Sequence, residues 1–123
     1  MRTPFAHRAL LLMPPGGDVR APGAAITLEL CGSWEHDPPC PLAAHYTSPQ
    51  RDDSQGDGDR LVVRVIFSCE PANEAEVRRR IEHALRAGAL TGPDGDTTRW
   101  VFSGSTSEVS TPRDLEHARR LAT

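Results

Sequence analysis

The most strand-like stretch of the sequence reads RLVVRVIFSC, residues 60–69. Positions 61, 63, 65, 67 and 69 are apolar and share one face, whereas positions 62, 64, 66 and 68 share the other face and include Arg64 and Ser68. This period of two, together with the β-branched residues, is typical of a β-strand. We expect residues 60–69 to form a central strand of a sheet.

A helix is predicted directly after this strand. Asn73 and Glu76 form a capping-box pattern at its start. Val77 and Ile81 begin a series of apolar residues at helical spacing, and Gly88 supplies a typical C-terminal stop.

The C-terminal part predicts one more strand and one more helix. The turn sequence GPDG at 92–95 precedes an apolar segment over 99–105, which we interpret as a strand. Thr111 and Pro112 then form a helix start, and the apolar face of that helix carries Leu115, Ala118 and Ala122.

The segment before residue 60 is less regular. Ile26, Leu28 and Leu30 alternate with polar residues, which predicts a first strand over about 26–31. Residues 1–25 are punctuated by Pro and Gly, and we interpret them as an added edge strand or a flexible segment. Residues 32–59 show neither period, so we expect a long loop whose second half, 48–59, has nothing able to form a core.

These elements predict an α+β fold in a single domain over 26–123, preceded by the 1–25 segment. The expected order is β-β-α-β-α, with an extra N-terminal strand as an option. A three- or four-stranded sheet with both helices on one face, a two-layer sandwich, is the most economical packing.

Composition excludes several classes of chemistry. The chain of 123 residues has 14 cationic residues, all Arg, and its net charge is −3. Without lysine there is no Schiff-base chemistry and no P-loop lysine. The acidic balance disfavours nucleic acid as a partner, and the Arg-only usage indicates a GC-rich genome. We interpret the run of arginines at 78–80 as the solvated face of a helix.

Cysteine usage and the apolar runs bear on the compartment. The longest apolar run, residues 9–13, is far shorter than a membrane span and ends at Pro14 and Pro15, so we expect no membrane segment and no export signal. Three cysteines, an odd number, then indicate a cytoplasmic protein with reduced thiols, which disfavours a disulfide.

The strongest chemical signal lies in CGSWEHDPPCPLAAH, residues 31–45. Cys31, His36, Cys40 and His45 have the spacing C-x4-H-x3-C-x4-H and offer the two thiolates and two imidazoles that Zn²⁺ binds in closed structural sites. Such a site has no open position for substrate, so it predicts no hydrolysis. We assign Cys69, on the apolar face of its strand, to the core.

Other interpretations of the same loop stay open. It can be an irregular loop with no metal. The dipeptide formed by Cys40 and Pro41, flanked by His36 and His45, resembles a heme-responsive motif, which implies heme as an alternative cofactor. A Cys–His pair is also the minimum for thiol-dependent catalysis, although no third orienting group is visible.

The function that we expect is therefore a small soluble binding or regulatory module, ordered by zinc, that presents Trp34 and Tyr46 to a protein partner. A non-enzyme is favoured over an enzyme. The alternatives are a thiol-dependent enzyme and a ligand-free dimeric domain, because a small sheet covered on one face leaves an open face or edge for self-association.

Overall fold

The computed structural model describes residues 2–32, 43–52, 60–108 and 111–122, and of residues 52, 118, 119, 121 and 122 it describes the backbone alone. A four-stranded antiparallel sheet and three α-helices make up most of this part of the chain. In chain order the elements are β1 (Thr3–Leu12), α1 (Ala21–Cys31), β2 (Ala44–Asp52), β3 (Arg60–Cys69), a 3-10 turn (Pro71–Asn73), α2 (Glu74–Arg86), β4 (Ala89–Thr91), β5 (Thr97–Arg99), β6 (Val101–Glu108) and α3 (Pro112–Ala122).

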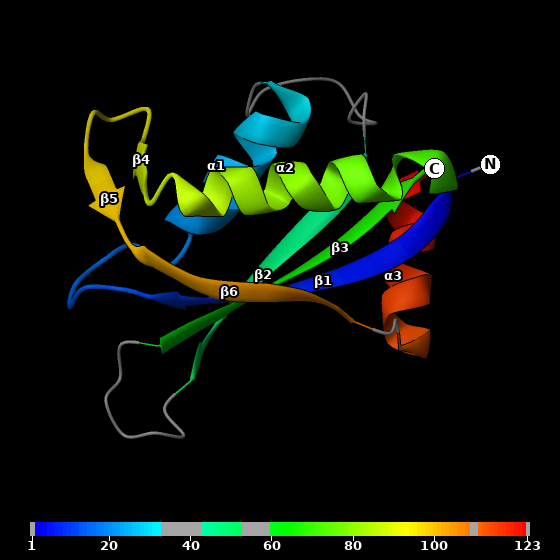
Figure 1. The fold of residues 1–123 in the computed structure, drawn as a ribbon, viewed down its shortest axis with the longest axis horizontal. Coiled ribbons are helices and arrows are strands. Elements are labelled where there is room, and N and C mark those ends of the chain that lie inside the picture. The colour runs from blue at the N-terminus through cyan, green and yellow to red at the C-terminus, as the bar shows by residue number, and fades with distance from the viewer. Residues whose placement is uncertain (1, 33–42, 53–59, 109–110, 123) are drawn as a thin grey trace.

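The strands of the main sheet are ordered β2-β3-β1-β6, and every neighbouring pair is antiparallel. With α1 after β1 and α2 after β3, the connectivity is that of a β-α-β-β-α-β, or ferredoxin-like, unit. The short β4–β5 hairpin is inserted before the last strand and projects from one end of the molecule (Figure 1). The fold class is thus α+β, as predicted, but the order of elements differs from the prediction.

The core lies between the sheet and the pair α1 and α2. Phe67, Val65 and Val63 of β3 are fully buried there and meet Val77 and Ile81 of α2 within one cluster. The predicted strand at 60–69 and the predicted helix after Asn73 are therefore confirmed. The Asn73 side chain, however, makes no capping hydrogen bond.

The predicted strand over 26–31 is wrong, because these residues belong to helix α1. The alternation of Ile26, Leu28 and Leu30 concealed a helical pattern in which Pro22, Ile26 and Leu30 are buried and Leu28 is only half-buried. Pro at the helix start and Gly32 in the left-handed conformation, φ 78°, at its end supply ordinary helix boundaries.

The N-terminal segment and the long loop also differ from expectation. Residues 3–12 form β1, an inner strand that pairs with both β3 and β6 rather than an edge strand. Residues 44–52, predicted as part of a loop, form the edge strand β2. Most of the described side chains of β2 are exposed, so its sequence shows no alternation of apolar and polar residues. The strand is held by its backbone pairing with β3.

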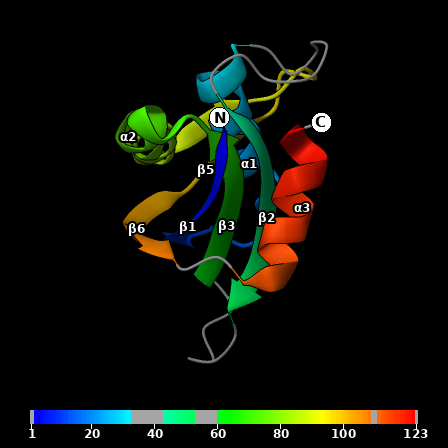
Figure 2. The ribbon, with the colours of Figure 1, turned by 90° about the vertical axis from the view of Figure 1, so that its right-hand side faces the viewer.

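The two helices predicted for one face lie on opposite faces. The helices α1 and α2 cover one face of the sheet, and α3 packs against the other (Figures 1 and 2). Arg64 explains the position of α3, because this side chain points away from the core on β3 and binds Asp114 of α3. The structure therefore has a helical layer on each side of the sheet instead of the predicted two layers.

None of the helices in the described ranges is long and apolar enough to cross a membrane.

Candidate functional site

The structure describes two of the four predicted zinc ligands and brings them together. Cys31 is the last residue of α1 and His45 is the second residue of β2, so they flank the 32–43 connection. The Cys31 Sγ and His45 Nδ1 atoms are 3.8 Å apart. His36 and Cys40 lie outside the described residues.

The His45 ring is held from both sides. Its Nε2 lies 2.9 Å from Thr27 Oγ1, and its Nδ1 lies 3.2 Å from the carbonyl oxygen of Ala43. A carbonyl oxygen can only accept, so Nδ1 donates to Ala43 in this arrangement, while the Thr27 hydroxyl donates to the carbonyl oxygen of Gly23 at 3.2 Å. The ring is half-buried and fixed in orientation.

Helix geometry explains why Thr27 and Cys31 face the same ring. Residues four apart in an α-helix lie on one face, one turn above the other, and here that face is turned toward β2. His45 pairs with Phe67 across the strands and therefore points to the side of the sheet that α1 and α2 cover. One helix and one strand thus position all three side chains.

Cys31 is disulfide-bonded, whereas Cys69 is a free, buried thiol. The expectation of reduced thiols throughout is corrected here for Cys31. The assignment of Cys69 to the core is confirmed by its complete burial, which also raises the pKa of its thiol.

The separation of Cys31 and His45 suits a shared metal once Cys31 is reduced. A thiolate at 2.3 Å and an imidazole nitrogen at 2.0–2.1 Å from one tetrahedral Zn²⁺ lie about 3.6 Å apart. With the metal on Nδ1, the ring would carry its proton on Nε2 and donate it to Thr27, the outer-shell contact that metal-bound imidazoles commonly make. No group of three or more metal-ligating side chains occurs within the described ranges.

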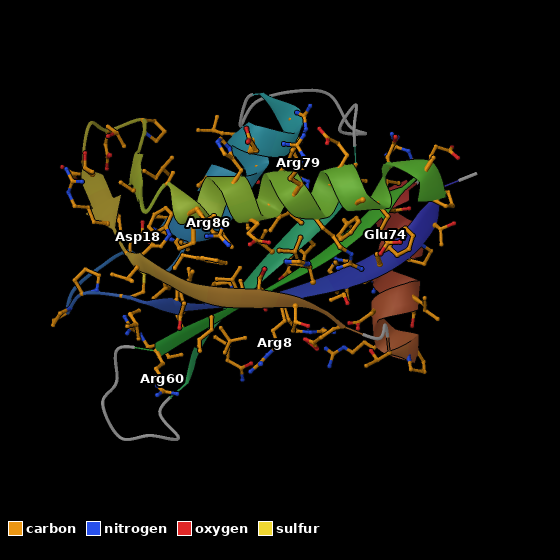
Figure 3. All side chains as sticks on the ribbon, in the orientation of Figure 1. Arg8, Asp18, Arg60, Glu74, Arg79 and Arg86 are labelled. Atoms are coloured by element: carbon orange, nitrogen blue, oxygen red, sulfur yellow. The ribbon has the colours of Figure 1, made fainter. Side chains whose placement is uncertain are left out.

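A second polar site, which the sequence reasoning missed, lies under α2. His7 of β1 is buried with 4% of its surface exposed. Its Nδ1 lies 2.9 Å from Arg78 Nη1, which also donates to the Ala6 carbonyl oxygen at 2.8 Å. Arg78 Nε in turn donates to Glu74 at the start of α2, which Figure 3 labels.

This contact fixes the protonation state of His7. Arginine can only donate, so His7 Nδ1 accepts and the ring proton of the neutral imidazole sits on Nε2. Burial first, and the Arg78 charge second, lower the pKa of His7. The Nε2 atom is buried and has no hydrogen-bond partner in the described part of the chain.

The sequence carried one signal for this site. In β1 the residues Phe5, His7, Ala9 and Leu11 alternate with residues of the other face, so a histidine stands among the inward positions of the strand. This signal can be used only once residues 3–12 are known to form an inner strand. Arg78 also departs from the predicted solvated arginine face. Only 17% of its side chain is exposed, and it lies over the Phe67 ring at 5.2 Å.

The other arginines of the 78–80 run match the prediction. Arg79 and Arg80 both pair with Glu76 of their own helix. Of the two aromatic residues predicted to bind a partner, Trp34 lies outside the described residues. Tyr46 is 46% exposed, and its ring packs against the ring of His117 on α3, with centroids 4.4 Å apart and planes tilted by 46°.

No family model, no curated protein and no solved structure matches the chain.

Proposed function

We propose that the protein is a small binding module in which Cys31, His36, Cys40 and His45 hold a structural Zn²⁺ in the reduced state. The single observation that carries the proposal is the 3.8 Å approach of Cys31 Sγ to His45 Nδ1. The two groups come from different elements, so a metal between them would fasten the end of α1 to the start of β2.

The chemistry of the surroundings supports the same site. Thr27 holds the far nitrogen of His45 at 2.9 Å and can accept its proton when Nδ1 binds a metal. Zinc binding needs the thiolate, and a disulfide at Cys31 withholds it. The module would therefore bind zinc only in protein whose Cys31 is reduced, and Trp34 and Tyr46 would be the aromatic side chains offered to a protein partner.

The test is the zinc content of untagged protein, purified anaerobically with a phosphine reductant and measured by plasma mass spectrometry. We expect about one zinc per chain, lost in Cys31→Ser, His36→Gln, Cys40→Ser and His45→Gln proteins. His83→Gln is the matched control, because His83 is 74% exposed, lies on α2 and pairs with Glu29 rather than with Cys31 or His45. Reduced protein without zinc, or zinc retained in the Cys31 and His45 variants, would refute the proposal.

A thiol-dependent enzyme is the second candidate, and the same geometry favours it. His45 Nδ1 faces the Cys31 sulfur while Thr27 holds Nε2, so an orienting third group is present after all. We place this candidate second because neither side chain lines the cavities at the start of α1 or at the end of α2. An enzyme would show one fast-reacting thiol at Cys31 that survives chelation, whereas zinc would protect the thiol until a chelator is added.

A further inference from the structure

A groove with a volume of about 970 Å³ lies where the end of β1, the end of α2 and the β5–β6 segment meet. Its apolar wall is formed by Leu12, Met13, Trp100, Val101 and Phe102. The volume falls in the range of sites for drug-sized ligands. The groove lies beyond the C-terminal end of α2, and neither Cys31 nor His45 contributes to it.

The floor of the groove is preformed. Trp100 is 5% exposed, and its Nε1 donates to the carbonyl oxygen of Leu85 at 2.8 Å, while its backbone nitrogen donates to Gly88 at 2.9 Å. A Cβ at position 88 would lie 3.0 Å from the Trp100 carbonyl oxygen, so this close approach requires glycine, which also has φ +71°. A rigid wall of this kind reduces the conformational entropy that the protein loses when a ligand binds.

The mouth of the groove is unusually apolar for a surface. Leu12 and Val101 are neighbours across β1 and β6, and they are 40% and 61% exposed. Together with Tyr46 they are the exposed large hydrophobic residues of the described ranges. Two of these three therefore lie side by side at one site, the pattern expected of a binding surface.

The charged side chains in the described lining of the groove are two arginines, one of them paired with a glutamate and the other also lining the neighbouring cavity with Asp18, Asp94 and Asp96. Arg86 and Arg99 line the groove, and its lining in the described structure contains no acidic residue. Arg86 reaches from α2 toward β6, where it lies over the Phe102 ring at 5.0 Å and pairs with Glu82 (Figure 3). Arg99 is exposed and has no carboxylate partner within the described ranges, so its guanidinium is free to bind an anion.

We propose that this groove binds a small amphipathic carboxylate, with its hydrocarbon part on Leu12, Val101 and Phe102 and its carboxylate on Arg99. The occupant is inferred from the volume and from the charge of the lining. Addition of a peptide strand to the β6 edge fits less well, because a register shift opposite Leu10 and Leu11 and the φ of +155° at Gly104 interrupt that edge. The proposal is independent of the zinc site.

The test compares decanoate with decanol, which has the same chain and no charge, by calorimetry and by the emission of Trp100 in a Trp34→Phe protein. We expect saturable binding of decanoate, at least tenfold tighter than binding of decanol. Arg99→Gln should remove about tenfold of the decanoate affinity and leave decanol binding unchanged. Val101→Ser should weaken the binding of both probes.

Arg113→Gln is the matched control, since Arg113 is an exposed arginine on α3, beyond the opposite end of β6. It should leave decanoate affinity unchanged. Equal affinities for decanoate and decanol, or full affinity in the Arg99→Gln protein, would overturn the proposal. Absence of binding together with a dimer in sedimentation that Val101→Ser dissociates would overturn it too, and would assign the groove to an interface between copies.

Discussion

At the scale of the residue, His7 shows how one donor can set the state of a buried ring. Arg78 occupies its Nδ1, so a second proton on the imidazole would face a guanidinium at 2.9 Å. The pKa of His7 is accordingly lowered from 6.5, by burial first and by Arg78 second. Glu82 opposes the shift without reversing it.

The consequence is a loss of stability in acid that belongs to this residue. The unfolded chain takes up a proton at His7 near pH 6.5, whereas the folded chain takes it up only at lower pH. Below pH 6.5 the free energy of unfolding should therefore fall by up to about 1.4 kcal/mol per pH unit from this group alone, until the folded pKa is passed. Urea unfolding of wild-type and His7→Leu proteins at pH 7.5, 6.0 and 5.0 measures this. If the free energy of unfolding changed equally with pH in the two proteins, the prediction would be contradicted.

Gly23 is the residue that lets α1 approach the sheet. A Cβ at position 23 would lie 2.4 Å from Thr47 Oγ1 and 3.1 Å from Thr47 Cβ, on β2. We expect Gly23→Ala to destabilise the protein by about 1–3 kcal/mol, because two packed elements must separate.

A double-mutant cycle with Thr47→Ala tests this cause. Removal of Oγ1 should recover part of the loss, so the two changes should be coupled rather than additive. Thr47→Ala alone is the control for the lost hydroxyl. Additive effects in chemical denaturation would show that the cost of alanine at position 23 does not come from the contact with β2.

At the scale of the element, the attachment of α3 depends on one carboxylate. Asp114 accepts from both terminal nitrogens of Arg64, at 3.0 and 2.8 Å, and from the backbone nitrogen of Thr111 at 2.9 Å. Thr111 Oγ1 in return accepts from the Asp114 backbone nitrogen, which completes a capping box. The bond from Arg64, before all other causes, lowers the pKa of Asp114.

Asp114→Asn should therefore loosen α3 from the sheet. We expect a cost of about 2 kcal/mol, below that of a fully buried pair because 29% of the Arg64 side chain is exposed. The contribution of the carboxylate is present above pH 3.8, the ordinary pKa of aspartate, and is lost as the pH falls below it. Faster hydrogen exchange of the α3 amides measures the loosening, and Arg113→Gln, one position away, should leave that exchange unchanged.

Elements differ in how well their sequence predicted them. The inner strand β3 and the amphipathic helix α2 each bury a face, so their periodicities of two and of 3.6 are clear in the residues. In α1 the small residues Ala21, Gly23 and Ala25 are buried beside Ile26, and small side chains leave no apolar periodicity to detect. The strand β2 is defined by its backbone pairing with β3, and a sequence does not show which backbone segments pair.

The candidate sites also differ in how much of them the sequence could predict. The choice of Cys31 and His45 as candidate ligands was predictable, because ligand types and their spacing can be seen in a sequence, but the prediction put them in one loop, whereas the structure holds them on α1 and β2. The His7–Arg78 contact and the groove at Trp100 were not, since each joins segments brought together only by the sheet order β2-β3-β1-β6. The spacing of residues along the chain can be seen in a sequence, whereas proximity between elements depends on the topology.

At the scale of the whole molecule, the sheet order predicts a hierarchy of local stability. The inner strands β1 and β3 are hydrogen-bonded on both sides and supply most of the fully buried side chains. Their amides should exchange only through global unfolding, whereas the β4–β5 hairpin and the edge strand β6 should exchange through smaller openings. Native-state hydrogen exchange at increasing denaturant measures this, and protection of β6 equal to that of β1 would contradict it.

The inner position of β1 also has a consequence for how the chain folds during synthesis. Residues 3–12 are made before any partner exists, and they pair with residues 60–69 and then with residues 101–108. The middle of the sheet must therefore wait for the emergence of both later strands, and loop closure over such distances slows folding. Until β6 arrives, one edge of a strand rich in leucine stays uncovered, so this interval is when a growing chain is most exposed to aggregation and to capture by chaperones.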